Sequence, residues 1–307
     1  MTVGQVGKPA RGEVFLGSIA VTSGALTRTQ LRGPDWRRVI HGVYTGGTVP
    51  LDHLVSCRAA LLVAPGEAAV GGTSAAWIFG AKAGRRDADP VRLVVPIGLS
   101  VPHRRGVVVH RFDVSACDVA EFCGLRMTTP LRTAWDIAAI ERLDNAVVAL
   151  DDMLNKGIID WQLLAGYAAD RVRCWGAARA RLAISLADGR AESPPESRVR
   201  LALVSAELRP RPQWTITDGS GTFVARVDLG FPAERVAVEY DGGYHAEPGQ
   251  LAKDRDRLNK IQEAGWTVVF VTAADLRDLT SVVDRVRGAL HRRRESSKRL
   301  GPATSRA

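Results

Sequence analysis

The sequence has only four cysteines in 307 residues, and they are scattered without any C-x-x-C spacing. Disulfide frameworks and structural zinc sites need paired cysteines, so we exclude both and expect reduced thiols in a cytoplasmic protein. Long apolar runs are also missing, because no stretch approaches the roughly 18 apolar residues of a membrane span. Glu13 and Ser18 interrupt or dilute the apolar run around Val14–Val21, so we expect neither a signal peptide nor a membrane contact.

The charge is not spread evenly, although the net charge of +9 invites a nucleic-acid interpretation. Residues 284–307 have eight Lys/Arg against two acidic residues, a net +6, and residues 1–190 have twenty-three against seventeen, also +6. Residues 191–283 have eleven Lys/Arg against fourteen Asp/Glu, a net −3. A single basic binding face would not give this distribution. With 46% hydrophobic and 24% charged residues, the chain has the composition of a folded globular protein.

The hydrophobic periodicity and the breaks between segments predict a multidomain protein of the α/β (α+β) class. Two short helices, Glu13–Ala20 and Ala25–Leu31, precede a basic hairpin around Trp36–Tyr44, which is the outline of a winged helix-turn-helix. The break at residues 188–195 predicts a domain boundary near residue 190. The predicted parts are a winged-helix domain at 1–50, a middle α/β and helical domain at 51–190, a C-terminal domain at 191–294 and a flexible basic tail at 295–307.

The C-terminal domain has the clearest order of elements, α-β-β-β-α-β-α, beginning with the helix Ser193–Ala206. Its chemistry gathers around the strand Arg235–Tyr240, because Glu239 and Asp241 lie two residues apart and share a face. An even-numbered loop before that strand would place Asp228 directly opposite Glu239. Carboxylates in so apolar a strand need a compensating cation or proton, and hard oxygen ligands suit Mg²⁺ or Mn²⁺.

Further groups are candidates for the same site. His245 could act as a general base, and Glu196 on the leading helix could complete the acidic cluster. Arg257 and Lys260, three residues apart on a helix, could face a phosphate backbone.

Each candidate also has a purely structural interpretation. Glu196 fits a capping box with Ser193, and the carboxylate pair could form a salt bridge with Arg226 or Arg235. Asp241 begins an Asp-Gly turn signal. His245 could be an ordinary loop histidine, and Arg257 with Lys260 could be a solvated helix face.

From Glu196 to Leu276 the chain resembles the Vsr-like branch of the PD-(D/E)XK nuclease superfamily, small domains similar to the very short patch repair endonuclease. The resemblance is carried by Glu196, the stretches Val227–Leu229 and Val238–Gly242 with Tyr244-His245, and the segments 253–257 and 261–272. It implies a restriction-endonuclease-like αβββαβ fold and an Mg²⁺- or Mn²⁺-dependent endonuclease. By this resemblance Asp228 is the metal aspartate, Glu239 is the acidic member of the D/E-x-K motif, and His245 is the histidine that follows that strand.

One departure from the family bears on catalysis. Asp241 stands where the motif lysine would be, and that lysine usually orients the attacking water and stabilises charge in the transition state. His245 or Lys260 would have to replace it, with Asp241 supporting the metal shell. Without a replacement the domain would be catalytically weak or inactive.

Residues 13–50 and 127–137 resemble the AbiEi-type antitoxin family. The segments that carry this resemblance are 24–31, 36–44 and 129–136. The resemblance implies DNA binding by a winged helix, self-repression of an operon and a nucleotidyltransferase-like toxin as partner. Arg28, Arg32, Arg37 and Arg38 are the expected phosphate contacts, unless the wing serves packing or a homodimer contact.

Two main hypotheses follow. The first is a cytoplasmic, metal-dependent endonuclease that acts on DNA rather than RNA, in DNA repair, phage defence or a toxin–antitoxin context. The alternative is a non-catalytic, antitoxin-like transcriptional regulator with a degenerate nuclease-fold domain. An interaction module without any nucleic acid is a third.

Overall fold

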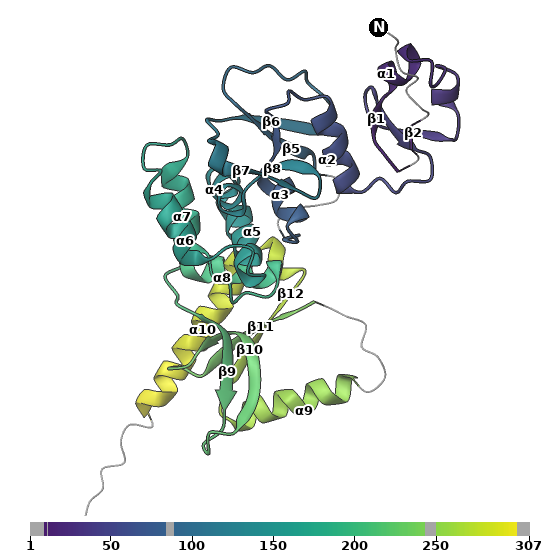
Figure 1. The fold of residues 1–307 in the computed structure, drawn as a ribbon. Coiled ribbons are helices and arrows are strands. Elements are labelled where there is room, and N and C mark those ends of the chain that lie inside the picture. The colour runs from purple at the N-terminus through teal and green to yellow at the C-terminus, as the bar shows by residue number, and fades with distance from the viewer. Residues whose placement is uncertain (1–8, 11, 84–88, 243–249, 300–307) are drawn as a thin grey trace, which may run out of the picture. The chain divides into compact units, whose positions relative to one another are not determined.

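The computed structural model describes residues 9–10, 12–83, 89–242 and 250–299 (Figure 1). The chain separates into two compact units. The first unit consists of Met1–Ala149 and Lys156–Ser185, and the second of Leu150–Asn155 and Leu186–Ala307. The change from one unit to the other after Ser185 lies close to the predicted boundary near 190, whereas the division into three domains and a tail stays a prediction.

The first unit begins with a three-stranded sheet in the order β1-β3-β2. Its elements are β1 (Phe15–Leu16), α1 (Gly17–Thr22), a 3₁₀ turn (Gln30–Arg32), β2 (Trp36–Ile40) and β3 (Val43–Gly46). The predicted hairpin is present. The predicted helix at 13–20 instead starts as a strand, because Phe15 and Leu16 pair with Tyr44 and Val43 of β3. The predicted helix at 25–31 is a turn that ends in the 3₁₀ segment, so the helix-turn-helix is not confirmed.

A mixed five-stranded sheet, in the order β6-β5-β4-β8-β7, forms the middle of the first unit. Its strands are β4 (Ala69–Val70), β5 (Val91–Val95), β6 (Val107–Arg111), β7 (Val119–Phe122) and β8 (Leu125–Thr128). The accompanying helices are α2 (His53–Leu62), α3 (Gly72–Ile78), α4 (Pro130–Ile140), α5 (Leu143–Asn155), α6 (Trp161–Ala169) and α7 (Ala177–Leu186). Helix α5 begins in the first unit and ends in the second.

The second unit has the predicted order of elements. They are α8 (Pro194–Ser205), β9 (Arg211–Thr217), β10 (Phe223–Phe231), β11 (Val236–Asp241), α9 (Gln250–Glu263), β12 (Thr267–Thr272) and α10 (Leu279–Arg299). The sheet order is β12-β11-β10-β9, with β12 parallel to β11 and the other pairs antiparallel. Helix α10 continues to Arg299, so the tail predicted from 295 begins inside this helix.

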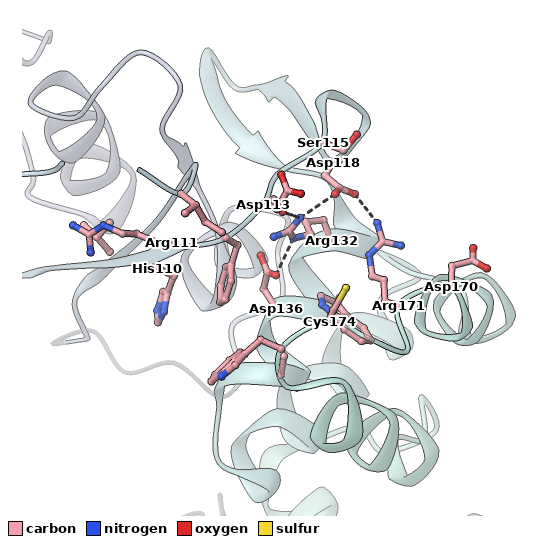
Figure 2. Close-up of a pocket in the computed structure, with 16 residues that line it drawn as sticks. His110, Arg111, Asp113, Ser115, Asp118, Arg132, Asp136, Asp170, Arg171 and Cys174 are labelled. Carbon is pink, nitrogen blue, oxygen red and sulfur yellow. Dashed lines mark hydrogen bonds and ion pairs between the residues drawn. The ribbon is translucent and has the colours of Figure 1, made fainter. Parts of the chain in front are cut away.

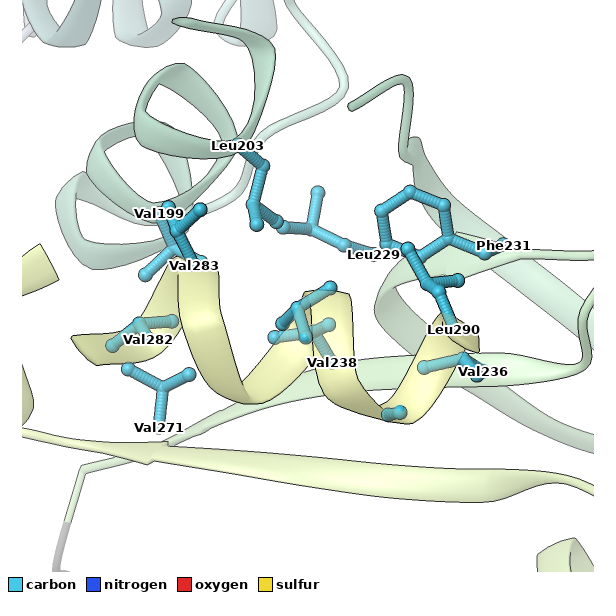
Figure 3. Close-up of a cluster of buried hydrophobic side chains, with 12 residues drawn as sticks. Val199, Leu203, Leu229, Phe231, Val236, Val238, Val271, Val282, Val283 and Leu290 are labelled. Carbon is cyan, nitrogen blue, oxygen red and sulfur yellow. The ribbon is translucent and has the colours of Figure 1, made fainter. Parts of the chain in front are cut away.

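Both faces of this sheet are buried by helices. Val199 and Leu203 of α8 and Val286 of α10 pack with Val238 on one face (Figure 3). On the other face Ile261 of α9 packs against Ala237. The chain is therefore a mixed α/β protein, as predicted. None of its described helices is long and apolar enough to cross a membrane.

The helix ends of the second unit follow from local sequence signals. Helix α8 starts with Ser193 as its N-cap, whose hydroxyl accepts a hydrogen bond from the Glu196 amide. Helix α9 ends at Glu263 and is followed two residues later by Gly265, which has a φ of +78°. The amides of Gly265 and Trp266 donate back to the carbonyls of Gln262 and Ile261, which is the Schellman arrangement. The N-cap hydrogen bond of the predicted capping box, from the Glu196 amide to Ser193 Oγ, is thus present.

Candidate functional site

The β10–β11 hairpin brings two of the predicted acidic residues together. Leu229 pairs with Val238, so the same register places Asp228 opposite Glu239, as the loop length predicted. The backbone amide of Tyr240 donates to Asp228 Oδ2 at 2.8 Å. Side chains directly opposite each other on an antiparallel pair share a face. Asp228 and Glu239 therefore lie side by side on the sheet.

Asp228 carries a perturbed carboxyl group. Its pKa is raised to about 6, first by burial and then by the negative charges of Glu196 and Glu239. The hydrogen bond from Tyr240 and the positive charge of Arg257 act in the opposite direction. The three carboxylates therefore interact electrostatically. Arg257 supplies one positive charge against these three acidic groups, so the cluster has an excess of acidic groups.

Arg257 of α9 is the cation that faces the acidic pair. Its Nη1 donates to Glu239 Oε2 at 3.0 Å, and its Nη2 bonds the other carboxylate oxygen and the Arg226 carbonyl. Glu239 is 8% exposed, so this is a fork-like ion pair of a buried carboxylate. Arg226, which the sequence offered as a salt-bridge partner of the carboxylate pair, instead forms an ion pair with Glu192 at 2.9 Å. Arg257, predicted to contact phosphate, is engaged within the protein.

Glu196 lies in the first turn of α8, after the N-cap Ser193, and both of its oxygens accept hydrogen bonds. Ser193 Oγ donates to Oε1 at 2.7 Å, while the Glu192 amide and Gln213 Nε2 donate to Oε2 at 3.0 and 2.9 Å. These bonds occupy three of the roughly four acceptor positions of the carboxylate. The structural interpretation of Glu196 is therefore confirmed.

Two other predicted site residues, Asp241 and Lys260, lie on the surface. Asp241 is exposed at the end of β11, and Lys260 forms an exposed ion pair with Asp256 at 2.8 Å. His245 lies outside the described residues.

A metal ion is not accommodated by the donors that the structure describes. Glu239 is committed to Arg257, and the oxygens of Glu196 are committed to the helix cap. No group of three or more His, Cys, Asp or Glu side chains in the described ranges is arranged to bind a metal. The Mg²⁺ or Mn²⁺ site stays a prediction, because His245 lies outside the described residues.

The predicted phosphate-binding arginines are all on the surface of the first unit. Arg37 and Arg38 lie on β2, and Arg32 ends the 3₁₀ turn near Arg28. All four are exposed, and none forms an ion pair with another described residue. Their charges are therefore available to a ligand.

Sequence reasoning missed a buried charge cluster in the first unit. Arg132 of α4, 5% exposed, donates to Asp136 Oδ1 at 2.8 Å and to Asp118 Oδ2 at 2.9 Å (Figure 2). The Tyr167 hydroxyl and Arg171 complete the partners of Asp118, at 2.6 and 3.4 Å. The (i, i+4) spacing of Arg132 and Asp136 was the only local signal, and such pairs are usually found on helix surfaces.

The chain is similar in sequence to a known domain family and to two mycobacterial proteins. Residues 67–186 match the AbiEi antitoxin C-terminal domain. The uncharacterized protein MT2308 of Mycobacterium tuberculosis strain CDC 1551 / Oshkosh is 33% identical over 192 residues, which cover 62% of this chain and 67% of that protein. The uncharacterized protein Rv2248 of strain H37Rv gives the same values.

Among solved structures, the RV2827C protein from Mycobacterium tuberculosis is 17% identical, with a TM-score of 0.41. The match covers 66% of this chain and 80% of that chain. The family assignment depends on the sequence relatives alone. The chain belongs to the family of the uncharacterized mycobacterial proteins MT2308 and Rv2248, and it has an AbiEi antitoxin-like domain at residues 67–186.

Proposed function

We propose that this chain is an antitoxin-like transcriptional regulator that binds DNA, and that its acidic cluster does not cleave nucleic acid. The match of residues 67–186 to the AbiEi antitoxin C-terminal domain carries the proposal. By the same family resemblance, the DNA is the region upstream of its own operon and the protein partner is a nucleotidyltransferase-like toxin.

The engagement of the acidic residues supports the non-catalytic part of the proposal. Glu239 forms two bonds to Arg257, and Glu196 accepts a hydrogen bond from Ser193, the N-cap of α8. An arginine held on the carboxylate that would bind a metal supplies one positive charge, half that of a divalent cation. The ion pair therefore offsets part of the negative charge where Asp228 and Glu239 lie together.

A metal-dependent endonuclease is the second candidate, and one observation favours it. Asp228 and Glu239 face each other within an α-β-β-β-α-β order of elements, and the pKa of Asp228 is raised to about 6. Perturbed carboxyl groups are enriched at active sites. Asp241 and His245 belong to this candidate, which would act on DNA rather than RNA.

A cleavage assay distinguishes the two candidates. We expect full-length protein to nick supercoiled plasmid no faster than its Asp228→Asn/Glu239→Gln variant, with Mg²⁺ or with Mn²⁺, because Glu239 is occupied by Arg257. Gel densitometry of the nicked form measures this. Metal-dependent nicking by the wild type that the double variant lacks would instead establish the endonuclease.

DNA binding would use the exposed arginines of the N-terminal sheet. Arg37 and Arg38 are adjacent on β2, and Arg28 and Arg32 lie near the 3₁₀ turn that precedes it. Exposed guanidinium groups without internal partners release counterions from DNA on binding, which makes affinity dependent on salt.

Charge reversal tests this interface. We expect Arg37→Glu/Arg38→Glu to weaken binding to a fragment from upstream of the gene by tenfold or more, and to reduce the slope of log affinity against log salt by about 2. Fluorescence anisotropy across a salt series measures both. The control is Lys253→Glu/Arg255→Glu, which makes the same charge change on exposed residues of α9. Equal losses in the two variants would contradict a specific N-terminal interface.

A further inference from the structure

A pocket of about 880 Å³ lies within the first unit, beside the buried cluster around Arg132 (Figure 2). Two large apolar side chains of its lining are mostly in contact with solvent. Ile97, which follows β5, is 71% exposed, and Trp175, in the turn between α6 and α7, is 64% exposed. Single exposed apolar residues are common, whereas apolar residues gathered at one concave surface indicate an interaction site. We refer to Ile97, Trp175 and the pocket that they line as the Trp175 surface.

The exposure of these two side chains indicates what kind of molecule can cover them. A small ligand held inside the pocket would leave most of the area of Ile97 and Trp175 in water. The hydrophobic gain requires that water is removed from the apolar side chain itself, and it grows with the area that is covered. A second protein surface can cover both side chains at once. The Trp175 surface is therefore suited to a protein partner.

The charges of the pocket indicate which protein fits. Three arginines and four aspartates line it, so opposite charges nearly cancel. The buried ones are bound to one another, because Arg132 forms ion pairs with Asp118 and Asp136 at 2.9 and 2.8 Å. The guanidinium of Arg132 also lies over the ring of Phe112, 5.9 Å from its centroid. A strongly acidic or basic partner, DNA included, gains little from such a surface, whereas two copies of it meet with little repulsion.

The Trp175 surface also has the shape that a two-fold contact requires. The same surface lies on both sides of such a contact, so a projecting group must be matched by a hollow on that surface. Trp175 is a largely exposed indole that lines a hollow of about 880 Å³. Each copy can therefore insert its indole into the hollow of the other. Tryptophan is also among the residues that contribute most to binding at the centres of interfaces.

We propose that the Trp175 surface is the interface of a homodimer, in which Ile97 and Trp175 of one copy enter the pocket of the other. A specific interface buries about 600 Å² or more on each partner, of which one tryptophan supplies on the order of 150 Å². Two apolar anchors on each side place this contact among the smaller interfaces, so we expect a dissociation constant on the order of 10 μM. The proposal does not depend on the proposed function, because association is measured without DNA.

Sedimentation velocity of the full-length chain at about 1 to 100 μM tests the dimer. We expect a shift from monomer to dimer with rising concentration, and we expect Ile97→Ser/Trp175→Ser to weaken association at least about tenfold. The matched control is Leu163→Ser/Phe223→Ser, since these side chains are 63% and 64% exposed and lie outside the pocket. The control should associate like the wild type. A monomer at every concentration, a series of larger oligomers, or equal losses in the two variants would overturn the proposal.

Thiol alkylation of the wild-type chain locates the contact without any variant. Cys174 lines the pocket and is exposed, whereas Cys123, also exposed, lies outside it in the turn between β7 and β8. Between about 1 and 100 μM protein, the alkylation rate of Cys174 should fall at least about threefold, because most chains are then paired. The rate of Cys123 should stay constant, and mass spectrometry of the labelled peptides measures both. A dimer in which Cys174 reacts equally fast at both concentrations would place the interface elsewhere and refute the assignment.

Discussion

Replacing Arg132 with leucine is expected to lower the free energy of unfolding of the first unit by about 3–5 kcal/mol, because buried Asp136 loses its bonded cation and Asp118 keeps only Arg171, at 3.4 Å. Asp118 and Asp136 are 3% and 2% exposed, and both bond to Arg132. The charge of Arg132 lowers the pKa of both carboxyl groups, although burial raises that of Asp136 to about 6. Hydrogen-exchange mass spectrometry of peptides from α4 measures the loss locally, independently of the second unit.

Two further variants make this test specific. Arg173→Leu removes an exposed arginine from the same unit and should change stability by no more than about 0.5 kcal/mol. Adding Asp118→Asn and Asp136→Asn to Arg132→Leu should recover part of the loss, because the uncompensated charges are then removed. Stability of Arg132→Leu within about 1 kcal/mol of wild type would show that the cluster is not held by its ion pairs.

Replacing Asp228 with asparagine is expected to stabilise the second unit at pH 7 by about 2 kcal/mol. Folding raises the pKa of this carboxyl from 3.8 to about 6. Between these values the folded state binds more protons than the unfolded state, so stability falls as pH rises through this window and stays reduced above it. The full shift corresponds to about 3 kcal/mol, which partial exposure reduces. Asparagine can still accept the Tyr240 hydrogen bond.

The pH dependence separates this effect from a general change in packing. The gain of Asp228→Asn should disappear near pH 3, where the wild-type carboxyl is protonated in both states, as measured by urea unfolding across pH. Asp256→Asn, which alters an exposed ion pair with Lys260, should stay within about 0.5 kcal/mol at every pH. A destabilised Asp228→Asn at pH 7 would mean that the fold requires the negative charge.

Long periodic elements were predictable from the sequence, while short strands were not. Helix α8 and strand β11 lie within one residue of the predicted bounds, because apolar spacing and flanking breaks specify them locally. Strand β4 has two residues and β7 is largely exposed, so neither produces a periodic signal. Residues 25–31 look helical by composition, yet a seven-residue segment is too short to hold a helix without tertiary support.

Of the candidate site, only the strand register that pairs Asp228 with Glu239 was predictable from the sequence. The loop between β10 and β11 determines that Asp228 faces Glu239, and this could be counted from the sequence. The choice of Arg257 as the partner of Glu239 could not, because it depends on how α9 lies on the sheet, 18 residues away. Likewise Arg132 meets Asp118 through the packing of α4 against a preceding loop.

The second unit is built from two separate segments of the chain, Leu150–Asn155 and Leu186–Ala307. This limits how the unit can be exchanged between proteins by recombination. Asp151, in the last turns of α5, bonds Arg200 of α8 at 2.7 Å and accepts from the Asp188 amide at 2.7 Å. A single recombination point near residue 190 would separate Arg200 from this buried partner. The second unit is therefore not a self-contained C-terminal segment that could be transferred to another protein by itself. A transferred segment would have to include the end of α5, or provide another acidic partner for Arg200 in place of Asp151.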